Sequence, residues 1–227
     1  MIQPIDFSGA AAVSEPGFRR AAAVGFYVQS FMPFSGKEPF PPAAQQASIP
    51  IVLMQLRYDG KIGFPGGIVE EGERAEEALL RELEEEMGVS EQTLGYTFAG
   101  RFEPTCAYEV SIPTGFFKGK LRSYFYSCAI TAEEMRAVER CGLSAEHFGS
   151  EVWGILRVSC GQSPPLPEYL GSSLGNFLKH EFLPSSDWQL FDLLIKRGLV
   201  SSHAVRGLYA AANKALPPQL QPEQSKL

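Results

Sequence analysis

Residues 67–89 read GIVEEGERAEEALLRELEEEMGV, and this stretch carries the clearest structural signals in the sequence. Four glutamates stand within five consecutive positions: Glu82, Glu84, Glu85 and Glu86. Like charges at helical spacing repel one another on an isolated helix. The run is therefore either a solvated surface or a face that meets a positively charged partner. Gly88 is typical of a helix C-cap, so we expect a helix that begins near Arg74 and ends there.

Helical geometry separates this segment into two faces. At about 100° per residue, Glu82, Glu85 and Glu86 lie within an arc of about 100°, while Glu84 points toward solvent. An apolar stripe lies beside them: Leu79, Leu80, Leu83 and Met87. Converging carboxylates favour protonation unless a hard cation such as Mg²⁺ or Mn²⁺ takes their oxygens as ligands. Because Mg²⁺ completes its shell with substrate phosphates, the pattern predicts phosphate-ester chemistry.

The composition of the chain is that of an ordinary globular protein. It has 227 residues, 44% hydrophobic and 20% charged, which suits one well-cored domain. The net charge of -6 argues against a broad, non-specific hold on nucleic acid. The trio Lys118, Lys120 and Arg122 could form a local basic groove, although a solvated loop is the plainer interpretation.

The cysteines do not indicate a zinc site or a disulfide scaffold, and the apolar runs do not indicate a membrane protein. The four cysteines are far apart, with no CxxC pair, so we expect reduced thiols and neither a zinc site nor disulfides. No stretch approaches the roughly 18 apolar residues of a membrane span, and the N-terminus lacks a basic start. We expect a soluble protein that is not secreted and has no membrane partner.

The rest of the chain alternates between strand and helix signals. Asp59-Gly60 is a hairpin signal, and Thr131 with Glu134 forms a capping box that opens a helix. We expect a loop at 104–120 and helices in the C-terminal part, one of which covers 186–198. The expected strands are residues 21–31, 50–57, a third that ends at 65–67, 95–103, 122–130 and 151–158. This order predicts a mixed α/β layered domain.

The spacing around the carboxylate helix resembles a known signature. Gly67, five residues, Glu73, seven residues and then 81–89 look like the complete motif of the Nudix hydrolases. The resemblance implies an α/β/α sandwich with a mixed sheet and extra C-terminal helices. It also implies Mg²⁺ or Mn²⁺ as cofactor and hydrolysis of a nucleoside diphosphate linked to another moiety.

The same resemblance assigns roles to residues. It implies that Glu82, Glu85 and Glu86 ligate metal together with the carbonyl of Gly66, and that Arg81 orients Glu73. Catalytic roles fall on Arg81, Glu85, Glu86 and Glu151. For Glu151 the alternatives are a metal ligand, a general base, or only a solvated residue at a strand edge. Glu109 is a weaker candidate for a place near the metal.

The stretch VLMQLRYDGKIGFPGG, residues 52–67, resembles more narrowly the small-nucleolar-RNA-decapping, inosine-diphosphatase Nudix subfamily, and the similarity runs over about residues 18–200. It implies that Arg57, Phe64 and Gln189 hold the purine and phosphates of the substrate. In the plainer interpretations, Arg57 is a surface strand residue, Phe64 is a core aromatic and Gln189 is an exposed helix residue. One position departs from the subfamily, because its purine-contacting histidine falls at Ala23.

The leading hypothesis is hydrolysis of a phosphoanhydride in an RNA cap or a (deoxy)nucleoside diphosphate. Alternatives are an organellar NAD(H), CoA or ADP-ribose diphosphatase, and a non-catalytic cap-binding module. In the subfamily dimers are common, so a homodimer is a further expectation.

Three segments are expected: an N-terminal extension (1–17), the hydrolase domain (18–212) and a flexible tail (213–227). The tail ends in Ser225, Lys226 and Leu227, the address read by the peroxisomal import receptor. It predicts that this receptor is a partner and that the protein resides in a peroxisome or glycosome-like organelle, with the cytoplasm as alternative.

Overall fold

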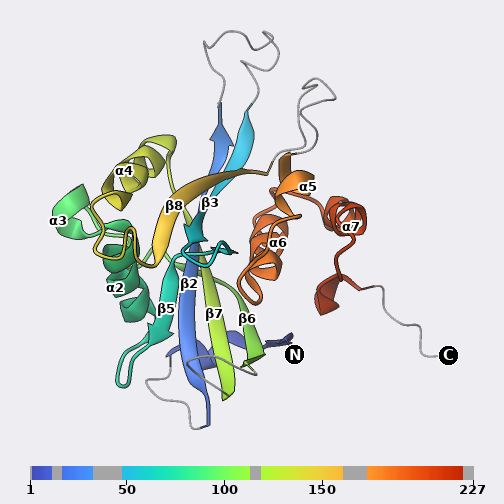
Figure 1. Cartoon of the computed structure of the whole chain (residues 1–227), viewed down its shortest axis with the longest axis horizontal. Coiled ribbons are helices and arrows are strands. Elements are labelled where there is room, and N and C mark those ends of the chain that lie inside the picture. The colour runs from blue at the N-terminus through green and yellow to red at the C-terminus, as the bar shows by residue number, and fades with distance from the viewer. Residues whose placement is uncertain (1, 12–16, 33–47, 113–118, 161–172, 222–227) are drawn as a thin grey trace.

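The computed structural model describes residues 2–11, 17–32, 48–112, 119–160 and 173–221. A mixed sheet lies between two helical layers (Figure 1). Helices α2, α3 and α4 lie on one side of the sheet, and α5, α6 and α7 lie on the other. This α/β sandwich with additional C-terminal helices confirms the predicted fold class.

The strands are β1 (Ile2–Ile5), β2 (Arg19–Phe31), β3 (Ile49–Arg57), β4 (Ile62–Gly63), β5 (Gly66–Val69), β6 (Glu103–Ile112), β7 (Gly119–Ala129) and β8 (Val152–Ser159). The helices are α2 (Ala75–Met87), α3 (Glu91–Leu94), α4 (Ala132–Gly142), α5 (Ser173–Phe177), α6 (Ser186–Lys196) and α7 (Ser202–Ala211), with 3₁₀ turns η1 (Phe7–Ala11) and η3 (Pro218–Leu220).

The long strand β2 organises the sheet. The strand order is β1-β6-β7-β2-β3-β4, with β5 paired to β2 and β8 paired to β3. β2 runs parallel to β7 and antiparallel to β3 and β5. Since side chains alternate along each strand, the sheet separates two cores, one under α2 and α4 and the other under α6 and α7.

Helix α2 forms where the sequence predicts it. It begins after the N-cap Arg74 and ends at Gly88, whose φ of 64° is the left-handed cap conformation. Leu79, Leu83 and Met87 are fully buried against the sheet, whereas Glu84 is exposed. The predicted capping box of α4 is also present, because Thr131 Oγ1 accepts from Glu134 N at 3.1 Å.

Two elements differ from the sequence prediction. Residues 95–103, expected to be a strand, are mostly an irregular connection after α3, and the expected loop at 104–120 contains β6. Within β6, Cys106, Tyr108 and Val110 alternate with Ala107 and Glu109, and the buried Glu109 carboxylate lies 2.8 Å from Lys120 Nζ. The expected third strand is divided into β4 and β5 at Pro65, whose carbonyl accepts from Val24 N.

The terminal segments pack against the domain. Within the expected N-terminal extension, β1 pairs antiparallel with β6, with Ile2 opposite Val110. The expected flexible tail is packed as far as η3, where Leu220 is buried and its carbonyl accepts from Arg206 Nε at 2.9 Å. Ser225–Leu227, the predicted import address, lies outside the described residues.

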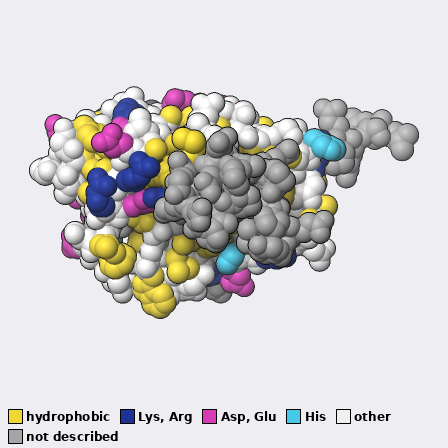
Figure 2. Space-filling model, turned by 90° about the horizontal axis from the view of Figure 1, so that it is seen from above, with side chains coloured by type: hydrophobic (Ala, Val, Ile, Leu, Met, Phe, Trp, Pro, Cys, Tyr) yellow, Lys and Arg dark blue, Asp and Glu magenta, His cyan; other side chains and the backbone are white. Residues whose placement is uncertain are grey.

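Basic side chains tie α4 to the sheet. On the face shown in Figure 2, Lys and Arg side chains gather on the side of α4 and β8. Arg157 of β8 pairs with Glu139 of α4, and Arg136 and Arg157 both lie over the Phe31 ring. All four cysteines are unpaired. No described helix has the length and apolar character needed to cross a membrane.

Candidate functional site

Two glycines let β5 lie close to its two neighbours, β2 and α2. Gly66 has φ of 140°, and a Cβ there would lie 2.1 Å from the Ala22 carbonyl oxygen. A Cβ on Gly67 would lie 2.2 Å from Glu82 Oε1. A side chain at position 66 would push β5 away from β2, and one at position 67 would separate β5 from the Glu82 carboxylate. The glycines therefore create a cradle in which backbone and carboxylate oxygens meet.

Arg81 lies at the centre of the acidic face. Its Nε and Nη2 each donate to a different carboxylate oxygen of Glu73 at 3.1 Å, so the predicted pairing with Glu73 is bidentate. Nη1 donates to Glu82 Oε1 at 2.9 Å and to Glu85 Oε2 at 3.1 Å. The hydrogen bonds to Glu73 raise the pKa of Arg81 further above its ordinary value. One guanidinium thus holds three carboxylates and fixes α2 to the preceding loop.

Glu86 occupies a different environment. Its side chain is only 2% exposed, and Oε2 accepts from Gly66 N at 2.9 Å. Arg57 Nη1 lies 3.4 Å from Oε1, which is a long contact for a buried charge. Burial raises the pKa of Glu86 to about 7. The ionised form of this residue therefore needs more positive charge than the protein itself provides.

The turn formed by residues 147–151 brings Glu151 close to Arg57, which also contacts Glu86. His147 N donates to the Glu85 carbonyl at 2.8 Å, and Glu151 N donates to the His147 carbonyl at 3.0 Å. Arg57 Nη2 lies 3.7 Å from Glu151 Oε2, whose side chain is about half exposed. Burial raises the pKa of Glu82, and the charges of Glu85 and Glu151 act in the same direction. Glu151 thus joins the carboxylate group, as the resemblance implied.

Glu109 takes no part in this group of contacts. It pairs with Lys120 at 2.8 Å and lies 3.8 Å from Arg122. Both cations also lie over the Phe18 ring, so the predicted solvated loop is an ordered part of β7. Lys118, the remaining member of that trio, lies outside the described residues.

The carboxylates suit a hard divalent cation in their chemistry. Within the described ranges, no three His, Cys, Asp or Glu side chains converge closely enough to hold an ion as they stand. Arg81 Nη1 contacts both Glu82 and Glu85, while Glu86 turns toward the backbone of Gly66. The donor set nevertheless consists of oxygens, as Mg²⁺ and Mn²⁺ prefer, and the buried Glu86 lacks a close counter-charge. The chemistry of these donors therefore fits such an ion.

A pocket of about 210 Å³ adjoins the carboxylates. The three residues predicted to hold substrate, Arg57, Phe64 and Gln189, all line it. The pocket reaches from Gly66 and Gly67 to the start of α6. Because Arg57 lines the pocket and also contacts Glu86 and Glu151, the two parts of the site meet at its guanidinium.

The lining residues refine the plainer interpretations. Gln189 is 3% exposed, not an exposed helix residue, and its Nε2 donates to Ser123 Oγ at 3.0 Å. Phe64 is a core aromatic that also lines the pocket, with its ring centroid 4.5 Å from that of Phe125. Ala23, where the subfamily has histidine, lines the pocket beside Gly66, its partner across β2 and β5. No ring reaches the pocket from this position.

Two polar residues of the site were not singled out from the sequence. Ser123 holds the Gln189 amide, and no sequence signal marks it, because serine is common in half-exposed strands. Gln55 is fully buried, and neither amide atom has a hydrogen-bond partner in the described part of the chain. Its amide lies near enough to Glu86 to lower the pKa of that carboxyl, without normal hydrogen-bond geometry. Its signal was available: a polar residue inside the apolar run IVLMQL.

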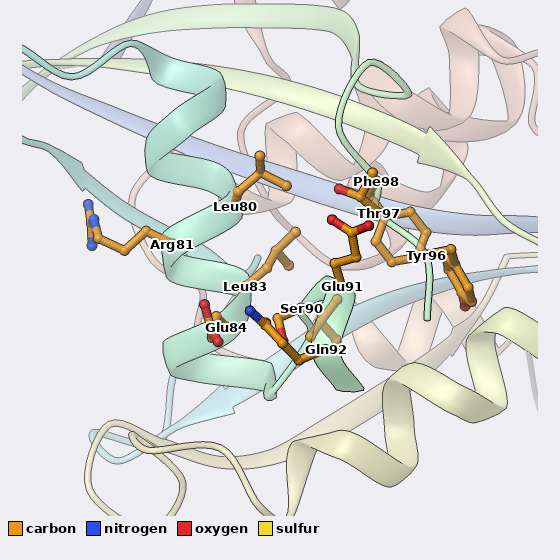
Figure 3. Close-up of a pocket in the computed structure, with 11 residues that line it drawn as sticks. Leu80, Arg81, Leu83, Glu84, Ser90, Glu91, Gln92, Tyr96, Thr97 and Phe98 are labelled. Carbon is orange, nitrogen blue, oxygen red and sulfur yellow. The ribbon is translucent and has the colours of Figure 1, made fainter. Parts of the chain in front are cut away.

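A separate pocket of about 220 Å³ lies between α2 and α3 (Figure 3). Leu80, Leu83, Tyr96 and Phe98 supply much of its wall. Arg81 lies at its margin and points away from the aromatic rings in Figure 3. Glu82, Glu85 and Glu86 do not line this pocket, so it lacks the chemistry of the carboxylate site.

Residues 44–200 match the family described as Nudt16-like: U8 snoRNA-decapping enzyme-like. The chain is 33% identical to the U8 snoRNA-decapping enzyme of Bos taurus over 168 residues, 74% of this chain and 77% of that one. For the enzyme of Homalodisca vitripennis the identity is 35% over 107 residues, and the match spans only about half of that relative (52%) and 47% of this chain.

The Tudor-interacting repair regulator protein of Homo sapiens is 30% identical over 168 residues, 72% of this chain and 71% of that one. The solved Nudix domain of Shewanella oneidensis NrtR with ADP ribose shares 14% identity and a TM-score of 0.48, over 86% of this chain and 100% of that one. At that distance the likeness carries no functional argument. From the family match and the bovine relative, the chain belongs to the Nudix hydrolases of the U8 snoRNA-decapping enzyme-like family.

Proposed function

We propose that this Nudix pyrophosphohydrolase uses Mg²⁺ or Mn²⁺ to cleave a phosphoanhydride bond in an RNA cap or a nucleoside diphosphate. The position of Arg57 carries the proposal. It lines the pocket that contains Phe64 and Gln189, and it also contacts Glu86 and Glu151. A nucleotide whose base enters the pocket would thus bring its phosphates to the carboxylates.

The carboxylates would hold the ions. Glu82, Glu85 and Glu86, with the Gly66 carbonyl, would supply the oxygen ligands. Bound metal neutralises charge on the phosphates and lowers the pKa of a coordinated water. Arg81 keeps Glu82 and Glu85 on the same side of α2 and ties them to Glu73. Glu151, half exposed and close to Arg57, would accept a proton from the attacking water.

The pocket favours a flat, mostly apolar group. Ala21, Ala23, Phe64 and Leu121 supply apolar lining, and Gln189 adds an amide that can pair with a base edge. Arg57 supplies a cation for phosphate oxygens. These features support a purine nucleotide, and the decapping activity in the names of the relatives supports a capped RNA end as one form of it.

A substrate panel tests the proposal. Purified protein would be incubated with Mg²⁺ or Mn²⁺ and capped RNA, IDP, GDP, NADH, CoA or ADP-ribose, and products would be identified by mass spectrometry. We expect phosphoanhydride cleavage of capped RNA or a purine diphosphate, abolished by EDTA. Preferred cleavage of NADH, CoA or ADP-ribose would contradict the substrate assignment. Tight binding of capped RNA without turnover would instead support a binding module.

A further inference from the structure

Gln55 lies beneath the carboxylate group, on β3. Its backbone pairs with Gly63 on one side and Ile155 on the other, so its place in the sheet does not depend on the side chain. The side chain alternates with Met54 and shares a face with Leu53 and Arg57. Leu53 packs in the core under α2, and Arg57 contacts Glu86. Gln55 therefore extends toward the buried end of α2.

The amide of Gln55 is costly in this position. It is fully buried, and within the described residues neither its nitrogen nor its oxygen has a hydrogen-bond partner. Arg57 Nε, on the same face, is also buried without a partner. Buried polar groups are nearly always satisfied, and an apolar side chain of the same size would avoid the penalty. The unpaired Gln55 amide therefore indicates a missing partner, and the neighbouring Glu86 carboxylate can accept a hydrogen bond from Gln55 Nε2.

We infer that Gln55 is a positioning residue for Glu86, which rests on the proposed metal site. With Glu86 as a ligand of a divalent cation, Gln55 Nε2 would donate to one carboxylate oxygen and keep the carboxylate directed at the ion. Gly66 N already fixes the same carboxylate from β5 at 2.9 Å. Gln55 and Gly66 thus orient Glu86 from two strands, as hydrogen-bonding neighbours of metal ligands do elsewhere.

Manganese binding tests this inference with a readout other than activity. Gln55→Met keeps the length of the side chain and removes both polar atoms. Electron paramagnetic resonance of Mn²⁺ titrated into the purified full chain should show a dissociation constant about tenfold higher in Gln55→Met than in the wild type. The melting temperature of metal-free Gln55→Met should be equal or higher, because an unsatisfied amide is removed. The Mn²⁺ concentration for half-maximal hydrolysis should rise by the same factor, with KM for nucleotide unchanged at saturating Mn²⁺.

Leu53→Met is the matched control, because it places the same side chain two residues away on the same face. It should leave the Mn²⁺ dissociation constant within about twofold of wild type. The inference is overturned if Gln55→Met binds Mn²⁺ like the wild type, or if Leu53→Met weakens binding as much. Should Gln55→Met not fold, Gln55→Leu carries the same test with the same two outcomes.

Glu86→Gln separates this inference from the proposed function. If Glu86→Gln loses Mn²⁺ while Gln55→Met does not, the metal site holds and only the role of Gln55 fails. If the wild type binds no Mn²⁺, or if Glu86→Gln binds it normally, the proposed metal site itself fails.

Discussion

Glu85 and Glu86 are adjacent on one helix, yet their charges are balanced in different ways. Glu85 is partly exposed and accepts from Arg81 Nη1 at 3.1 Å, within a group of carboxylates that one guanidinium already holds. Glu86 is buried, its nearest cation is Arg57 at 3.4 Å, and its pKa is raised to about 7 by burial. Part of the acidic face is thus neutralised from within the protein.

The contrast indicates that Glu86, more than Glu85, needs an external cation. A partly exposed carboxylate that accepts close hydrogen bonds from arginine is nearly satisfied without metal, whereas a buried carboxylate with one long ion pair is not. We therefore expect Glu86 to contribute most to metal binding, and Arg81 to contribute most to the shape of the site.

Glu86→Gln removes the charge of the buried member of the pair. We expect kcat to fall roughly a thousandfold, since about 4 kcal/mol of metal-dependent stabilisation is lost. The variant should remain folded, because the amide keeps the shape of the carboxylate. Steady-state kinetics with capped RNA and with IDP, beside circular dichroism, measure both effects. Glu84→Gln, on the exposed face, is the control and should keep near-normal kcat; a small effect of Glu86→Gln would refute the contrast.

Arg81→Lys disturbs the exposed part of the group. Lysine cannot reproduce the bidentate contact with Glu73 and the contacts with Glu82 and Glu85 together. We expect kcat to fall about a hundredfold and the free energy of unfolding to fall by about 1–2 kcal/mol. Urea denaturation and kinetics provide the two values. Arg74→Lys affects an exposed pair with Glu77 and should change neither measurably; equal behaviour of the two variants would count against a central role for Arg81.

The pH dependence of stability sharpens the comparison at Glu86. Burial raises its pKa from 4.5 to about 7, so between these values the folded protein retains a proton that the unfolded chain has released. For this group, the free energy of unfolding is highest below pH 4.5, falls as the pH rises to 7 and is constant above.

Metal-free Glu86→Gln should therefore gain about 1–3 kcal/mol over wild type at pH 8 and little at pH 4.5. Urea denaturation in EDTA across that range measures the difference. Glu84→Gln should follow the wild-type curve. Parallel curves for wild type and Glu86→Gln would show that burial of Glu86 imposes no such penalty.

Ser123→Ala tests the pocket apart from the carboxylates. Ser123 Oγ accepts from Gln189 Nε2, so its loss frees the amide without touching the acidic face. We expect KM for a purine diphosphate to rise about threefold to tenfold, the loss of one hydrogen bond, with kcat nearly unchanged. Ser127→Ala, at a buried position outside the pocket lining, should leave KM unchanged. If Ser123→Ala instead lowered kcat with KM unchanged, Ser123 would act in the chemical step and not in substrate binding.

The sequence predicts a feature well when the residues that form it are close together in the chain. Helix α2, its cap at Gly88 and its two faces follow from residues within four positions of one another, and the structure confirms them. The pairing of Arg81 with Glu73 also follows from a local motif. The pocket combines β2, β3, β7 and α6, which only the tertiary fold brings together.

The differences from the sequence prediction arise in two ways. In β6, Cys106, Tyr108 and Val110 do alternate as in a strand, but Pro104 and Pro113 at the ends of the segment favour a loop. Ser123 acquires a role only through its contact with Gln189, 66 positions away. Such contacts leave no periodic trace in one sequence.

The metal site itself is tested most directly by crystals soaked in Mn²⁺ and measured at the manganese absorption edge. We expect an anomalous peak within coordination distance of Glu82 and Glu86 and next to the Gly66 carbonyl, with Arg81 still paired with Glu73. Crystals saturated with Mn²⁺ that show no anomalous density at these oxygens, with Arg81 Nη1 still between Glu82 and Glu85, would contradict it.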